Sequence, residues 1–531
     1  MAKWLILISF AVVLGVPFMV RPPDAVKPSD AERLVIITPH VEPIRVEFGL
    51  AFDAWHREKF GAPAWIDWRV PGGTSDIQKQ LKAVYEKAIT TGQLTPAGEL
   101  APGFAPMPFD LFFGGGTYEH NQTKQGVKAR PPGAEKEVTL SMSISAGFPP
   151  ERVTAWFGEN TLGSGHLYDP PNEKTGDPGQ YWIGTAASGF GIVYNRDLLK
   201  RFNLPEPASW DDMCRPELMG WIGLADPRQS GSVATLYDSI MNNLGWERGW
   251  RTLRDMGANA RYFSNSSPKV PLDVSQGEAV MGVAISHYGR FQAQMVMRPG
   301  ETPANSRVGY VDPPGLVYVD ADPISLMRGG ANPTVARRFI EFCMSERGQA
   351  LWQFHVRAAG VTPSDSEPTT WGPAQFELRR MPVRREMYEK YGALMVDPVS
   401  PFEIASTVKE RGWRSAVAPL MGAFAIDTLR ELQAARSAFE AAKTRGAEAG
   451  GGDAGVGNAT RLAEMERLLY ALPPWTNADG TVLEFTEANY KAIREDWKKA
   501  EKDGRMAAVR AGWIRFFRGN YARVVELGAG G

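Results

Sequence analysis

Short apolar runs alternate with helical stretches in the first part of the chain. The run at 34–38 is continuous and apolar, typical of a strand buried on both faces of a parallel sheet. A helix is predicted over 44–60, a strand over 64–70, a helix over 77–87 and a strand over 109–113. This order predicts an α/β fold with a parallel sheet.

A second pattern of the same kind begins near residue 181. Strands are predicted at 188–195, 221–225, 279–285, 308–311, 317–319 and 323–327, with helices at 232–244 and 332–352. Beyond residue 400 the pattern is mainly helical, with aromatic residues at helical spacing. A chain of 531 residues is long enough for about three domains or two large ones.

Composition excludes some classes of protein. The net charge of -1 provides no basic field for nucleic acid. The two cysteines, Cys214 and Cys343, rule out a four-cysteine zinc site and are predicted to be buried thiols. The 43% of hydrophobic residues suffices for a large core.

The N-terminus carries the form of an export signal. Lys3 precedes an apolar run over 4–20, which Arg21, Pro22 and Pro23 end. The run is close to the lower limit of about 17 residues for a membrane span, so a signal peptide and an uncleaved anchor both remain open. We therefore expect a periplasmic or extracytoplasmic protein that contacts the membrane only through this segment.

Three loops share one design: each follows a predicted buried strand and combines glycine with hydroxyl residues. Ligands of open α/β sheets bind beyond the carboxyl ends of the strands, where helix N-termini offer free N–H groups. Such loops favour an anionic group. The alternative is ordinary N-capping. The candidate ligand-binding residues are Gly73, Thr74 and Ser75, then Gly115 and Gly116, then Ser230, Gly231 and Ser232.

The order of these segments resembles the family 1 extracellular solute-binding proteins, closest to the branch with the ferric-iron-binding proteins. The stretch 188–195, Ser-Gly-Phe-Gly-Ile-Val-Tyr-Asn, is similar to the strand that crosses into the second lobe. Ala225-Asp226-Pro227 with Ser230-Gly231-Ser232 is similar to the ligand loop of that lobe, and 277–288 to a ligand-facing strand end. The resemblance covers roughly residues 33–360.

The resemblance implies a two-lobed, type II periplasmic-binding fold that closes around its ligand by a hinge. It places lobe one at 33–180 and 319–400 and lobe two at 181–318. Outside the resemblance, residues 1–32 are expected to form the signal or anchor with its linker, and 401–531 a helical extension that caps lobe one or contacts a partner. The implied partner is the membrane permease of an ABC importer.

The resemblance also suggests the ligand. Iron-binding members carry a Tyr-Tyr pair where this chain has His287-Tyr288. Those two residues with His40 and Asp76 form a candidate set of ligands for ferric iron, which would then be the transported solute. With Thr38 and Ser188 and the three loops, His287 and Tyr288 form a candidate site for a small anionic solute. Arg228 and Arg290 are further candidates for pairing with an anion.

Catalysis is not predicted. The sequence has no phosphate-binding Gly-x-x-x-x-Gly-Lys motif, no His-Glu-x-x-His and no Gly-x-Ser-x-Gly. A secreted hydrolase remains an alternative, because carboxylate pairs can be assembled from distant positions. A membrane-tethered ligand-sensing domain is the other alternative.

Overall fold

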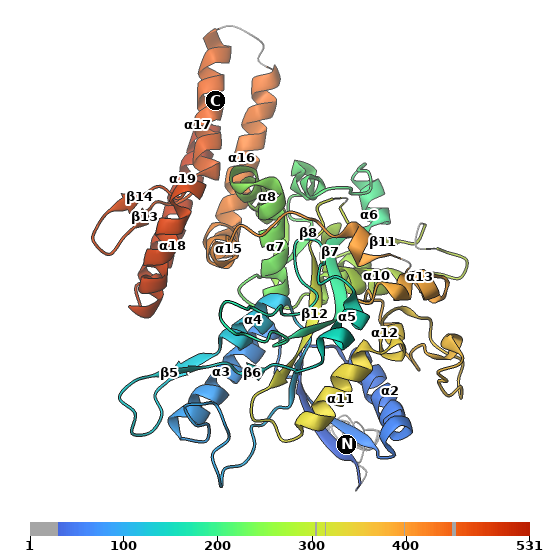
Figure 1. Ribbon diagram of the computed structural model, residues 1–531. Coiled ribbons are helices and arrows are strands. Elements are labelled where there is room, and N and C mark those ends of the chain that lie inside the picture. Colours follow the sequence, from blue (N-terminus) through green and yellow to red (C-terminus); the bar gives the residue numbers. More distant parts are fainter. Residues whose placement is uncertain (1–29, 303–304, 314, 398, 449–452, 531) are drawn as a thin grey trace, which may run out of the picture.

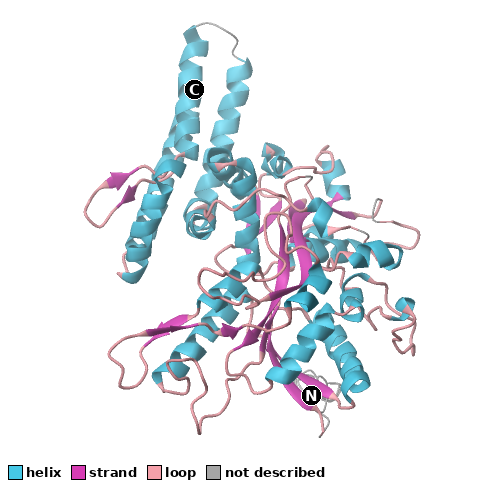
Figure 2. Cartoon of the chain, viewed as in Figure 1, coloured by secondary structure: helices cyan, strands magenta, loops and turns pink. Residues whose placement is uncertain are grey.

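Two parallel three-stranded units form one continuous sheet with two long antiparallel strands between them (Figures 1 and 2). The computed structural model describes residues 30–302, 305–313, 315–397, 399–448 and 453–530. The strand order is β2-β1-β3-β12-β7-β10-β8-β9, with β6 paired to β12 and β11 to β7. The predicted α/β class is therefore confirmed, with two lobes and a helical C-terminal part.

Lobe one is built on β1, β2 and β3, which run parallel. Apolar residues alternate between the two faces of β1: Leu34 and Ile36 join one core cluster, and Val35 and Ile37 the other. The elements of this part are β1 (Glu32–Ile37), α2 (Glu42–Phe60), β2 (Ala64–Arg69), α3 (Thr74–Thr90), β3 (Leu111–Phe113), α4 (Thr117–Gln125), β4 (Val127–Ala129), β5 (Val138–Leu140), β6 (Ser143–Ile144) and α5 (Pro150–Phe157).

Lobe two is built on β8, β9 and β10, where β8 pairs in parallel with both neighbours. Its elements are α6 (Arg196–Arg201), β8 (Ile222–Ala225), α7 (Gly231–Leu244), α8 (Trp246–Ala258), β9 (Ala260–Ser264), α9 (Lys269–Gln276), β10 (Met281–Ile285), α10 (Ser286–Met295) and β11 (Val308–Val311). The sequence had not predicted β9, because its five residues mix apolar and polar side chains.

Two strands connect the lobes. The first half of β7 (Ile183–Asn195) pairs with β12 (Val319–Met327), and its second half pairs with β10 and β11. Thus β7 leads into lobe two and β12 returns. The predicted strands at 317–319 and 323–327 are one strand, with a register irregularity between Asp322 and Pro323. The exact domain boundaries given above stay predictions.

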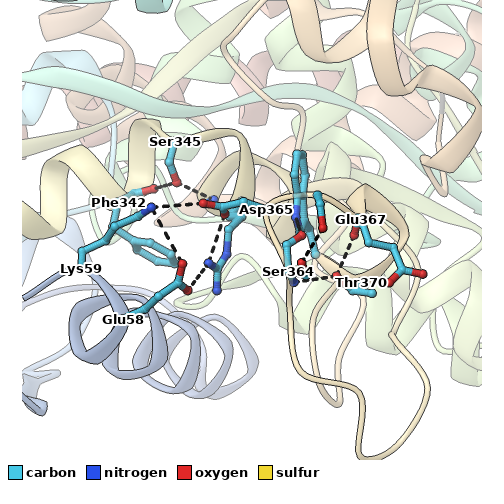
Figure 3. Close-up of polar contacts among 12 residues, drawn as sticks. Glu58, Lys59, Phe342, Ser345, Ser364, Asp365, Glu367 and Thr370 are labelled. Atoms are coloured by element: carbon cyan, nitrogen blue, oxygen red, sulfur yellow. Dashed lines mark hydrogen bonds and ion pairs between the residues drawn. The ribbon is translucent and has the colours of Figure 1, made fainter. Parts of the chain in front are cut away.

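After β12 the chain packs back onto lobe one through α11 (Pro333–Met344), α12 (Glu346–Gln353) and α13 (Glu386–Tyr391), and then α14 (Pro401–Ile404). Ser345 separates α11 from α12 by capping the second helix, so the single helix expected over 332–352 is two. The C-terminal end of α2 is tied to this return segment (Figure 3): Lys59 Nζ lies 3.1 Å from Asp365, and Arg347 donates to Glu58 at 2.6 Å.

The C-terminal helices are α15 (Arg414–Met421), α16 (Leu429–Glu448), α17 (Asp453–Tyr470), α18 (Glu487–Lys502) and α19 (Met506–Ala529), with a short hairpin of β13 (Trp475–Thr476) and β14 (Val482–Leu483). They share one core cluster with lobe two, in which Trp246 and Trp250 lie with Trp413 and Phe424. Of the two expected roles, a cap on lobe one is therefore contradicted, and a surface for a partner stays a prediction. The tryptophans of α8 contact the extension, Trp246 against Trp413 and Trp250 against Phe424. Helices α16 and α17 project away from both lobes (Figure 1).

Two further predictions can be compared with the structure. Cys214 and Cys343 are free thiols; Cys343 is fully buried as predicted, whereas Cys214 is only half-buried. Within the described ranges, no helix has the length and apolar character that crossing a bilayer requires. The predicted signal or anchor at 4–20 lies outside those ranges.

Candidate functional site

A cleft of about 410 Å³ lies between the lobes, at the carboxyl ends of the parallel strands. Its walls come from the loops after β1, β2 and β3 on one side and after β8, β9 and β10 on the other, with β7 and β12 at the back. Of the predicted residues, it is lined by Gly73, Thr74, Gly115, Gly116, Ser188, Ser230, Ser232, His40, His287 and Tyr288.

Four predicted residues do not line the cleft. The Thr38 hydroxyl accepts the N–H of His40 and is fully buried. Ser75 and Asp76, on the first turn of α3, are not among the lining residues, and Asp76 lies 3.2 Å from Lys79 at the surface. Gly231 is packed against lobe one instead.

Six helices begin at the cleft. The residue that precedes the first turn lines it in each of α2, α3, α4, α7, α9 and α10; these residues are Val41, Gly73, Gly116, Ser230, Pro268 and Ile285. A helix N-terminus carries about half a positive charge and N–H groups without intrahelical acceptors. The cleft is therefore suited to negative charge.

One of these helix ends already holds a carboxylate. Asp320 of β12 accepts the Thr117 N–H at 3.0 Å and the Thr117 hydroxyl at 2.8 Å at the start of α4. Burial raises the pKa of Asp320 to about 7, which the two hydrogen bonds from Thr117 oppose.

The sequence did not predict the arginine of the site. Arg380 lies on the return segment and lines the cleft with its side chain almost fully buried. It donates to Asp322 and, at 3.2 Å, to His287 Nε2. Burial lowers its pKa to about 10, partly offset by Tyr288, so the guanidinium is still charged at neutral pH.

The two cleft histidines are neutral. Burial, followed by the charge of Arg380, holds the pKa values of His40 and His287 well below the ordinary value. Because a guanidinium cannot accept a hydrogen bond, His287 Nε2 accepts and Nδ1 carries the proton. Among the described protein atoms, His287 Nδ1, His40 Nε2 and Arg380 Nε have no hydrogen-bond partner. Buried polar atoms are rarely left so, and these three belong to side chains that line the cleft.

A glycine leaves the space that the His40 ring occupies. Gly114, with φ +87°, lies where a Cβ would collide with the His40 ring, so both the conformation and the space require glycine. The ring also packs edge-on against Phe113 with centroids 4.5 Å apart.

The loop after β9 adds a polar wall that the prediction lacked, because β9 itself was not predicted. Asn265, Ser266 and Ser267 line the cleft, and Ser267 shares a 3.0 Å hydrogen bond with Ser230. A hydroxyl-rich loop before Pro268 was the available sequence signal.

The two predicted arginines pair elsewhere. Arg228 is bound by Asp226 and by Asp427 of the extension, and Arg290 by Asp312. Neither arginine lines the cleft, whereas Arg380 does so although it too is paired with a carboxylate, Asp322. Their expected role in anion pairing is therefore unsupported by the geometry.

The metal set is not assembled in the structure. His40, His287 and Tyr288 line the cleft, but Asp76 does not. In the part of the chain that the structure describes, no three His, Cys, Asp or Glu side chains form a group that could hold a metal ion.

The fold defines a protein of two α/β lobes with a cleft between them. Residues 163–374 match the family model described as "Bacterial extracellular solute-binding protein", which spans lobe two and the return to lobe one. The expected resemblance to the extracellular solute-binding proteins is thus confirmed over this part of the chain.

Among curated proteins, the chain is similar to the phosphoglycerate transport regulatory protein PgtC of Salmonella typhimurium, with 26% identity over 176 residues, 32% of this chain and 40% of that protein. The chain thus spans less than half the length of this relative. Among solved structures, the substrate-binding protein of the ABC transporter from Agrobacterium tumefaciens has a TM-score of 0.48 at 16% identity, covering 76% of this chain and 95% of that one. Iron-bound HitA from Pseudomonas aeruginosa has a TM-score of 0.42 at 14% identity, covering 72% and 99%.

Proposed function

We propose that this protein captures a small anionic solute between its lobes and delivers it to the permease of an ABC importer, without chemical turnover. The observation that carries the proposal is the convergence of six helix N-termini and the charged Arg380 on one cleft. Helix N-termini bind phosphate and carboxylate groups through backbone N–H groups. The protein would act outside the cytoplasm, after export directed by its N-terminal segment.

The unpartnered donors define the preferred chemistry. His287 Nδ1–H and Arg380 Nε–H can each donate to an anionic oxygen, and Ser230, Ser232 and Ser266 provide hydroxyls on the opposite wall. Such a cleft suits a ligand with a strongly charged group at one end and hydroxyl or carboxylate groups at the other. The name of the Salmonella relative supports a three-carbon phosphorylated acid as the first ligand to test.

The test is a thermal-shift and calorimetry panel on purified protein. It includes 3-phosphoglycerate, inorganic phosphate, ferric citrate and, as an uncharged control, glycerol. A ligand at 100 times its Kd stabilises the native state by about 2.7 kcal/mol. We expect 3-phosphoglycerate or phosphate to raise Tm and glycerol to leave it unchanged.

Two outcomes would overturn parts of the proposal. If ferric iron alone raised Tm and gave a visible phenolate-to-metal absorption, the anionic ligand would be replaced by the metal. If 3-phosphoglycerate were consumed with saturable kinetics, the protein would be an enzyme.

A second candidate function is ligand sensing, because the printed name of the Salmonella relative is that of a regulatory protein. The joined core of lobe two and the extension gives a route by which ligand-driven movement of lobe two would also move the helices. A sensor would not stimulate ATP hydrolysis by a reconstituted importer when loaded with ligand, whereas a delivery protein would.

A further inference from the structure

Arg414 lies where lobe one, lobe two and the extension meet. It is the first residue of α15, and its side chain is largely buried. The guanidinium donates to Glu119 Oε1 at 3.2 Å and to the Gly231 carbonyl at 2.9 Å. It also lies 3.7 Å from the centroid of the Tyr118 ring. Tyr118 and Glu119 belong to α4 of lobe one, and Gly231 begins α7 of lobe two, so one side chain joins both lobes.

Arg414 is attached to lobe two and moves with it. The residues around it in sequence, Trp413, Ala416 and Val417, belong to the core that α15 shares with lobe two. Trp413 packs edge-on against Trp246 of α8 at 5.2 Å. The contacts of Arg414 with Tyr118 and Glu119 are therefore contacts between two bodies, which separate when the lobes open.

The lobes touch beside Arg414. A Cβ at Gly231 would collide with the Glu119 carboxylate and lie 2.8 Å from Thr74 Oγ1. Thr74 starts α3, so the N-terminus of α7 lies directly against α3 and α4 of lobe one. This contact adjoins the cleft, because Thr74 and Ser230 line it.

The surroundings of Arg414 are acidic. Tyr318 donates to Glu410 Oε1 at 3.3 Å, just before α15 along the chain. Asp238 of α7 is buried; burial and Glu410 raise its pKa to about 7, while Arg414 opposes that rise. Asp320 is a further carboxyl group in this region, and the charges of Glu410 and Glu119 contribute to the rise of its pKa. A cation at this position offsets several negative charges as well as pairing with Glu119.

We propose that Arg414 is a latch, supplied by the C-terminal extension, that holds the two lobes closed over the cleft. This inference rests on the proposed function insofar as closure captures a solute. Charge-assisted hydrogen bonds in a partly buried setting contribute enough to shift the closed-to-open ratio by about tenfold. The extension thereby sets how readily the cleft closes and how tightly it retains its ligand.

The latch is tested by measuring the distance between the lobes without any ligand. Nitroxide labels at Lys82→Cys on α3 and Lys200→Cys on α6 place one exposed probe on each lobe. Burial raises the thiol pKa values of Cys214 and Cys343 well above the ordinary value, so both native cysteines resist labelling at neutral pH. Pulsed electron paramagnetic resonance then reports the closed and open populations.

We expect Arg414→Gln to lower the closed-to-open ratio about tenfold and Glu119→Gln to do the same. The matched control is Arg467→Gln, which removes an exposed arginine from the extension, paired with Glu464 on the same helix. It should leave the distance distribution unchanged.

A second variant tests closure of the lobes through a steric clash, without changing a charge. Gly231→Ala places a methyl group against Glu119 and Thr74 and should shift the population to the open state even with Arg414 intact. Circular dichroism at 222 nm verifies that each variant is folded. The latch is refuted if Arg414→Gln and Glu119→Gln both retain the wild-type distance distribution.

Binding of 3-phosphoglycerate, measured in parallel, separates this inference from the proposed function. If the wild type bound neither 3-phosphoglycerate nor phosphate while Arg414→Gln still opened the lobes, the proposed ligand class would fail and the latch would stand. If the wild type bound 3-phosphoglycerate and Arg414→Gln altered neither the distances nor the affinity, the latch would fail and the proposed function would stand.

Discussion

Removing the ion pair between Arg380 and Asp322 tests how the cleft is stabilised. Both side chains are at most 10% exposed, and Ser188 Oγ donates to the same carboxylate at 2.9 Å. The perturbation is Arg380→Gln, which leaves Asp322 buried without its cation. Removing one partner of a buried pair costs about 3–5 kcal/mol, because the remaining charge is uncompensated.

A double-mutant cycle measures the coupling free energy between Arg380 and Asp322. Asp322→Asn should also destabilise the fold, since it leaves the buried Arg380 charge unpaired. The double variant removes both charges, so it should cost less than the two single changes added together. We expect a coupling of about 2–3 kcal/mol for groups in direct buried contact. Arg380 is charged throughout at pH 7, given its pKa of about 10.

The assay is urea unfolding at pH 7, followed by tryptophan fluorescence and compared at equal m-values. The matched control is the same cycle on Arg523 and Glu526, an ion pair at 2.9 Å whose side chains are 60% and 63% exposed. Exposed pairs contribute about 0.2–1 kcal/mol. Equal couplings in the two cycles would refute the view that Arg380 and Asp322 form a buried charged pair.

Three further predictions concern other parts of the molecule. Ser232→Ala should weaken binding of 3-phosphoglycerate about fivefold in calorimetry by removing one hydroxyl donor, with Tm unchanged; full affinity would exclude Ser232 from the site. Asp238 has a native pKa of about 7 against an ordinary 3.8, so the native state binds more protons between these values. Wild-type stability relative to Asp238→Asn should therefore fall as pH rises from about 4 to about 7, by roughly 1.4 kcal/mol for each pKa unit between the two values; a flat difference in urea titrations would contradict it. Arg254 of α8 donates to the carbonyls of Leu469 and Ala471 in the extension. Arg254→Met leaves both carbonyls unpaired and should lower the free energy of unfolding, measured in urea, by about 2–4 kcal/mol. An unchanged urea midpoint would show that this contact does not stabilise the packing of the extension on lobe two.

Much of the cleft could be predicted because its residues follow strands. Gly73, Gly116 and Ser230 each come directly after a strand or its turn, and parallel strands end at one edge of a sheet. Local sequence therefore places these loops together without knowledge of the packing. His287 and Tyr288 were predicted for the same reason, since they follow β10.

The loop after β9 was missed for a local reason. Residues 260–264 lack a continuous apolar run, so neither a strand nor a strand end was predicted there. Ser266 and Ser267 therefore went unassigned, although they resemble the other hydroxyl-bearing loops.

The sequence by itself determined the strand and helix alternation, the glycine and hydroxyl loops at the strand ends, and the family resemblance, because each depends on neighbours a few residues apart. Only the tertiary structure decided the charges of the site. Arg380 contacts His287, which is 93 residues away in the sequence. Arg228 and Arg290 instead form ion pairs with carboxylates outside the cleft. The extension likewise joined lobe two because its apolar helices bury Trp246 and Trp250. Partners of long charged side chains and of apolar helix faces are selected by packing between distant segments, and no local pattern encodes that choice.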